Sequence, residues 1–115
     1  SLVVNFADKF LFVEENETSN TLDIYGNLTL IHSIPLYDYD DISILYDRLS
    51  DRWLVLFVTS NFTNGVVIDK KDSCIEFTLD TRVSDSKQFY GNVLYYATNG
   101  KICYYNINTK RENFI

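Results

Sequence analysis

The chain has few of the residues from which enzyme motifs are built. Its 115 residues include four glycines and one histidine, His32. Phosphate-binding loops, dinucleotide fingerprints and the G-x-S-x-G turn need glycines at fixed spacings, and none of these motifs is present. One imidazole forms no zinc site by itself, and no serine or cysteine motif accompanies it. Sixteen acidic residues are available, but no spacing selects a glycosidase pair among them. The sequence predicts no catalytic residue, metal or cofactor.

Basic residues are also scarce. Ten Lys and Arg against sixteen Asp and Glu give a net charge of −6, and the only adjacent basic pairs are Lys70-Lys71 and Lys110-Arg111. Binding to a nucleic-acid backbone needs clustered cations, so we expect no nucleic-acid partner. The longest apolar run, Trp53 to Val58, has the length of a strand. A transmembrane helix needs about 20 apolar residues, so no membrane span is predicted.

Cysteine is limited to Cys74 and Cys103, which are 29 residues apart. This spacing fits neither a zinc ligand pair nor a redox C-x-x-C motif. Both residues fall in strands predicted for neighbouring units, so a disulfide between them would join one unit to the next. Two buried free thiols are the alternative. We expect a disulfide between Cys74 and Cys103.

What the chain has in abundance is alternating apolar sequence. Apolar residues make up 46% and aromatic residues 16% of the chain. The dominant period is two, and Gly-Asn or Asn-Gly dipeptides at residues 26–27, 64–65, 91–92 and 99–100 are typical of tight hairpin turns. The pattern predicts an all-β fold. The expected strands are Leu2–Phe6, Phe10–Glu14, Leu22–Tyr25, Leu28–Ile34, Ile42–Asp47, Trp53–Ser60, Val66–Asp69, Cys74–Leu79, Val93–Ala97 and Ile102–Ile107. The polar stretch Asp80–Gln88 is expected to be a surface loop.

A short sequence pattern, a turn followed by bulky apolar residues, occurs three times. Its leucines, Leu11, Leu54 and Leu94, are 43 and 40 residues apart, and about 40–45 residues is the length of one four-stranded propeller blade. The repetition predicts antiparallel, blade-like hairpin units at approximately 7–36, 42–79 and 89–115. Only the middle unit is long enough for four strands. A β-sandwich of hairpins is the alternative.

The segment Ile42–Leu79 carries a family resemblance. Its first part, from Ile42 to Val55, resembles the inner hairpin of secreted β-propeller-type repeat proteins, in which Tyr-Asp closes one strand and Arg-Trp opens the next. The resemblance implies blade-like sheets and binding to partners, and it supplies no catalytic residues. Residues 41–53 also have a helical apolar face, but strand–turn–strand is favoured because the neighbouring repeats require it. Three blades leave a ring open, so the chain is expected to oligomerise or to be part of a longer polypeptide.

The densest acidic cluster lies beside the single proline, Pro35. Its aspartates alternate with tyrosines, which offer rigid contact area at a loop tip, so we expect a recognition surface here. A solvated acidic loop is the alternative, and a Ca²⁺ site is less favoured because the EF-hand spacing is absent. The candidate binding residues are Tyr37, Asp38, Tyr39, Asp40 and Asp41.

Three N-x-S/T sequons place possible glycosylation sites at Asn16, Asn27 and Asn61. All three fall at predicted turns, where an acceptor asparagine is exposed. Chance occurrence is the alternative explanation. If used, the sequons would place the protein outside the cell or on a virion surface.

The tyrosine pairs 95–96 and 104–105 should place one ring on each face of a sheet, so that one tyrosine of each pair is accessible. Together these patterns favour a non-catalytic extracellular β-repeat module, an acidic glycoprotein that binds a protein or glycan partner through loops and exposed tyrosines. One alternative is a structural component of a virion, coat or matrix. The other is a fragment of a larger propeller enzyme.

Overall fold

The computed structural model describes residues 2–6 and 9–115. In this part of the chain there are twelve β-strands and no helix. The strands are β1 (Leu2–Phe6), β2 (Lys9–Asn16), β3 (Thr21–Gly26), β4 (Thr29–Pro35), β5 (Asp41–Asp47), β6 (Arg52–Val58), β7 (Thr63–Ile68), β8 (Cys74–Leu79), β9 (Lys87–Tyr90), β10 (Val93–Thr98), β11 (Lys101–Asn106) and β12 (Arg111–Phe114).

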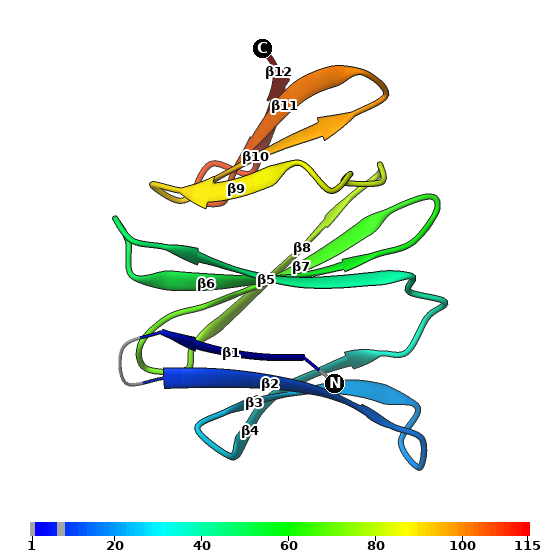
Figure 1. Cartoon of the computed structure of the whole chain (residues 1–115), viewed down its shortest axis with the longest axis vertical. Coiled ribbons are helices and arrows are strands. Elements are labelled where there is room, and N and C mark those ends of the chain that lie inside the picture. The colour runs from blue at the N-terminus through cyan, green and yellow to red at the C-terminus, as the bar shows by residue number, and fades with distance from the viewer. Residues whose placement is uncertain (1, 7–8) are drawn as a thin grey trace.

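The strands form three antiparallel sheets of four, each made of consecutive strands. We call β1–β4 the first sheet, β5–β8 the middle sheet and β9–β12 the last sheet. They lie one above another along the 38 Å long axis of the molecule (Figure 1). The all-β fold with blade-like hairpin repeats is confirmed, and the three sheets form an open stack.

The expectation that only the middle unit has four strands is wrong. The first sheet gains β1, which lies ahead of the predicted unit, and the last sheet gains β9 and β12. Neither β9 nor β12 has the apolar alternation that marks a strand in sequence. In β12 every residue is exposed, so backbone pairing with β11 defines this strand.

Two hydrophobic cores lie between the sheets. One fills the space between the first and middle sheets with Leu11, Ile24, Trp53 and Phe57 among its members. The other lies between the middle and last sheets. Strand β6 contributes to both, because alternate residues point to opposite faces. Its residues from Trp53 to Val58 are all at most 2% exposed.

The repeated leucines are fully buried in the second strand of each sheet, but they are not equivalent. Leu11 and Leu54 point toward the sheet that follows, whereas Leu94 points back at the middle sheet. The hairpin turns explain the difference. Leu54 is two residues beyond the last pair of its hairpin, Asp47↔Arg52, and Leu94 is one residue beyond the equivalent pair of its own. A shift of one residue turns a side chain to the opposite face.

Residues 41–53 form strand, turn and strand, as predicted, and not a helix. Tyr46 pairs with Trp53 across β5 and β6, with ring centroids 5.2 Å apart. The ammonium group of Lys9 lies 5.5 Å from the Trp53 ring. The Tyr-Asp and Arg-Trp pairs noted in the sequence therefore close one hairpin around a core tryptophan.

One predicted turn is wrong: Asn64-Gly65 lies inside β7. A glycine is needed at position 65 because a side chain packs closely on its backbone, and not because the position has a positive φ. A Cβ atom built on it would lie 2.3 Å from the Phe77 ring, which covers it from β8. That ring stacks on Tyr105 at 4.7 Å. Glycine in a strand interior commonly marks such a contact.

The predicted Cys74–Cys103 disulfide is wrong as well. Both cysteines are free thiols. Cys74 packs against the core between the first and middle sheets, and Cys103 lies in the core between the middle and last sheets. The middle sheet separates the two cores.

The segment predicted as a surface loop, residues 80–88, is partly structural. Val83 is 1% exposed and enters the core below the last sheet. Its amide donates to the hydroxyl of Thr63, which donates in turn to the carbonyl of Thr81 (2.9 Å). The segment then continues into β9 at Lys87.

A buried carboxylate joins the middle sheet to the last. Asp47, at the end of β5, accepts hydrogen bonds from the amides of Gly91 (2.9 Å) and Asn92 (2.7 Å) in the β9–β10 turn. It also accepts from Leu49 and Ser50 in its own turn. Burial acts to raise the pKa of Asp47, but these hydrogen bonds outweigh it and the pKa lies below its ordinary value.

Replacing Asp47 with Asn should destabilise the fold by about 1.5–3 kcal/mol, because several hydrogen-bond donors then lose a charged acceptor. Asp38→Asn, at an exposed position, is the control and should change little. Because the pKa of Asp47 is lower in the folded state than in the unfolded state, its carboxylate stabilises the fold at pH values above the unfolded pKa of about 3.9. This stabilisation is lost as the pH falls through the folded pKa. Urea unfolding should therefore show a gap between wild type and Asp47→Asn at pH 7 that narrows near pH 3. A gap independent of pH would contradict this role.

Gly65→Ala should destabilise the protein by about 1–3 kcal/mol through overpacking against the Phe77 ring. Phe77→Leu in the same chain should recover part of the loss, because the obstructing ring is then gone. The two substitutions would give a non-zero coupling energy in a double-mutant cycle measured by thermal or urea unfolding. Strict additivity would show that Gly65 does not need this close contact.

Candidate functional site

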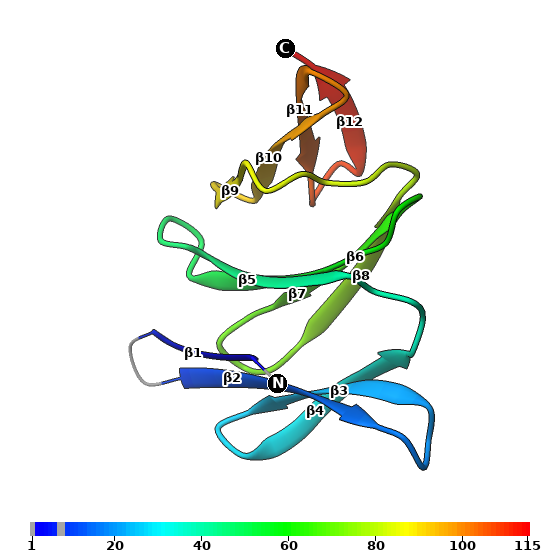
Figure 2. The same cartoon turned by 45° about the vertical axis from the view of Figure 1, so that its right-hand side comes forward.

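The sequence-predicted loop is the linker between the first and middle sheets, residues 36–40 and the start of β5. Backbone hydrogen bonds hold it at both ends. The amide of Leu36 donates to the carbonyl of Asn20 (3.0 Å), and the amide of Asp40 donates to the carbonyl of Val58 (2.9 Å). The linker therefore has a defined conformation between two rigid sheets (Figure 2).

Three aromatic rings form what we call the aromatic platform: Tyr37, Tyr39 and Phe62. Tyr37 lies 5.8 Å from each of the other two rings in edge contacts. Tyr37 is 53% exposed, although it is held in place by its neighbours. Tyr39 is half-buried, accepts a hydrogen bond from Asn64 (2.8 Å) and packs on Phe57. Burial raises the pKa of Tyr39. The platform is an accessible, rigid contact surface.

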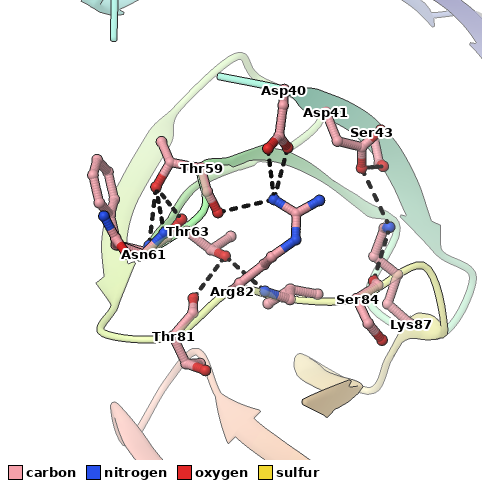
Figure 3. Close-up of polar contacts among 12 residues, drawn as sticks. Asp40, Asp41, Ser43, Thr59, Asn61, Thr63, Thr81, Arg82, Ser84 and Lys87 are labelled. Atoms are coloured by element: carbon pink, nitrogen blue, oxygen red, sulfur yellow. Dashed lines mark hydrogen bonds and ion pairs between the residues drawn. The ribbon is translucent and has the colours of Figure 1, made fainter. Parts of the chain in front are cut away.

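Arg82, in the linker between the middle and last sheets, and Lys87, at the start of β9, lie against Asp40 and Asp41 (Figure 3). Arg82 donates to both carboxylate oxygens of Asp40, at 2.7 and 2.9 Å, and to the carbonyl of Thr59. Lys87 lies 3.7 Å from the carboxylate of Asp41. Asp40 and Asp41 are therefore paired with cations, and the charge of the acidic cluster is partly balanced within the fold.

A cleft of about 510 Å³ opens between the first and middle sheets beside the platform. We call it the acidic cleft. Tyr39, Asp40 and Asp41 line one side, and Glu14 and Glu15 at the end of β2 line the other. The apolar part of its lining is Leu2, Val13, Leu22 and Ile42. Carboxylates are acceptors only, so this cleft suits a group that brings hydrogen-bond donors.

Sequence reasoning found the linker half of this site and missed the rest. Glu14, Glu15 and Phe62 come from strands and turns distant in the chain, and no local pattern connects them with Tyr37 or Tyr39. Arg82 was missed for the same reason. Asp38 is exposed and is not part of the cleft lining. Within the described ranges, no group of three or more His, Cys, Asp or Glu side chains could hold a metal ion.

Two of the three sequon asparagines, Asn27 and Asn61, lie outside the strands, as predicted, whereas Asn16 is the last residue of β2. Asn61 and Asn27 are exposed, whereas Asn16 is half-buried. The amide nitrogen of Asn16 donates to the buried carboxylate of Asp23 (3.1 Å). Asn61 precedes Phe62, so it lies beside the aromatic platform.

The tyrosine pairs also divide as expected. Tyr96 and Tyr105 are buried against the middle sheet, and Tyr95 is 40% exposed on the opposite face. Tyr95 and Tyr104 face each other across β10 and β11, with ring centroids 6.3 Å apart. Part of the exposed tyrosine surface is therefore used in a cross-strand contact within the sheet.

Fold and site together define the class: an all-β protein of three stacked four-stranded sheets with an aromatic and acidic surface at the first linker. Comparison with protein-family models, curated proteins and solved structures found no match. The part of the chain that the structure describes has no helix able to cross a membrane.

Proposed function

We propose that this chain is a non-catalytic extracellular β-repeat module that binds a protein or glycan partner. The observation that carries the proposal is the aromatic platform at the rim of the acidic cleft. Tyr37 exposes half of its surface while two other rings hold it. Such a ring loses little conformational entropy when a partner packs on it, which is typical of recognition surfaces.

The chemistry of the cleft narrows the partner. The carboxylates of Glu15, Asp40 and Asp41 accept hydrogen bonds and carry negative charge, although Arg82 and Lys87 balance part of it. Sugar hydroxyls and the cationic groups of Lys or Arg are donors that fit this set. An aromatic ring beside the acceptors can stack on the apolar face of a sugar or on a guanidinium group.

An extracellular or virion-surface location is part of the proposal. Its support is the exposure of two sequon asparagines, Asn27 and Asn61, at turns of the structure. A glycan on Asn61 would stand beside the platform and limit the direction from which a partner approaches.

Truncation of the platform tests the proposal. Tyr37→Ala should weaken binding to the best ligand from a glycan array or a Lys/Arg peptide library by roughly 30-fold, as expected of a central aromatic contact. Folding should not change, because the side chain is exposed. The matched control is Phe114→Ala, since Phe114 is 65% exposed in the last sheet and lies on neither the platform nor the cleft. The proposal fails if wild type binds neither probe set, or if both variants lose binding equally.

Sequon use gives a second test. When the chain is expressed through a secretory pathway, Asn27 and Asn61 should carry glycans at higher occupancy than Asn16, because the Asn16 nitrogen is hydrogen-bonded to Asp23. Peptide mapping before and after glycosidase treatment measures the occupancy at each site. Asp23→Asn should raise occupancy at Asn16 if that hydrogen bond limits access. The order predicted here is contradicted if Asn16 is the most fully modified.

A further inference from the structure

The stack ends in two sheet faces that no other part of the described chain covers. The strand registers place their residues, because directly paired residues point to the same face and alternate with core residues. The first end face, on the first sheet, is Val3, Phe10, Phe12, Tyr25 and Leu30. The last end face, on the last sheet, is Tyr90, Val93, Tyr95, Ile102 and Tyr104.

These faces are more apolar than an ordinary solvated sheet face. Val3 and Leu30 are 55% and 51% exposed on the first end face. On the last end face Ile102 is 55% exposed and Tyr95 40%. Contiguous apolar surface of this kind marks an interaction site more often than scattered hydrophobic residues do.

The two interfaces inside the molecule indicate what covers such a face. The middle sheet presents one face to the first sheet and the opposite face to the last sheet, and each of its faces is covered by another four-stranded sheet. By position in the stack, the first end face corresponds to the side of the middle sheet that holds Trp53, Val55 and Phe57. The last end face corresponds to the side that holds Leu54 and Leu56. A contact between the two end faces would repeat a packing that the chain already makes twice.

The sheets also meet along corresponding edges at the two interfaces. Strand β5 contacts β1 on one side and β9 on the other, so neighbouring sheets approach each other through their first strands at both interfaces. Sheets that approach along the same edge each time rotate about an axis beside that edge. Repetition of this step leads toward a closed ring and not a straight column.

Charge favours a contact between unlike ends. The registers place Glu14 on the first end face and Arg111 on the last end face, and both residues are exposed. Joining a first face to a last face brings opposite charges together, whereas joining two first faces brings like charges together, which disfavours that pairing.

We propose that two copies of this chain associate head to tail, with the first end face of each copy on the last end face of the other, to close a ring of six sheets. Six lies within the range of about four to eight for radial sheets. Four strands about 4.8 Å apart and five or six residues long offer roughly 300–400 Å² of projected area per face. Closure covers four faces at once and reaches the standard size of a stable interface, about 1,200–2,000 Å².

Sedimentation velocity at high micromolar concentration measures the mass of the species that the 115-residue chain forms in solution. Wild type should sediment with twice the mass of the chain. Val3→Lys on the first end face and Ile102→Lys on the last end face should each sediment as a monomer with unchanged circular dichroism, because both positions are exposed in the single chain. Leu49→Lys is the matched control: Leu49 is 66% exposed in a turn of the middle sheet, so this variant should remain dimeric.

Mixing separates the unlike pairing from a like pairing. Each of the two blocked variants keeps one intact face, and these intact faces are the complementary ones. An equimolar mixture of Val3→Lys and Ile102→Lys should therefore form an open heterodimer through the one intact contact, more weakly than wild type because the ring cannot close, whereas neither variant dimerises alone. A monomeric wild type, an open series of larger oligomers, or a dimer that persists in either variant alone overturns the proposal. Tyr37 lies on the linker and not on either end face, so Tyr37→Ala should leave the mass unchanged.

Discussion

Burial of β6 on both of its faces is the constraint on which the stack depends. A strand with water on one face alternates apolar and polar residues, whereas β6 is continuously apolar from Trp53 to Val58 and needs a neighbour on each side. The first and last sheets provide these neighbours, and each needs only one apolar face to do so. The middle sheet is therefore the structural centre, and the outer faces are left to other uses.

Hydrophobic packing alone does not determine how one sheet is oriented on another, because it is not directional. Polar contacts between the sheets add direction. Asp47 accepts from the turn of the last sheet, and the ammonium of Lys9 pairs with Asp72, which joins the first sheet to the middle one. Arg82 connects the second linker to Asp40 in the first. These contacts involve turns and linkers, where the backbone leaves the sheets, and they set the relative position of the layers.

The limits of sequence prediction follow from the same physics. Period-two alternation reveals a strand only where one face is buried, so β10, with Leu94 and Tyr96 inside, could be predicted and β12, exposed throughout, could not. Gly65 was predicted as a turn because its covering ring, Phe77, is paired to it only by the fold. The linker half of the site was visible as a run of Tyr and Asp. Its other half comes from β2 and from the β6–β7 turn, which only the stacking of sheets brings near.

The candidate site and the end faces draw on different consequences of this architecture. Side chains of different sheets converge at a linker, where the sheets no longer fill the space between them. That is why Glu15 and Asp41 reach one cleft although they are distant in the chain. An end face instead arises because the first and last sheets each pack on a neighbouring sheet through one face only, which leaves the other face uncovered. A fold of this kind can therefore present a recognition surface at its linker and an assembly surface at its ends, and changes on one need not disturb the other.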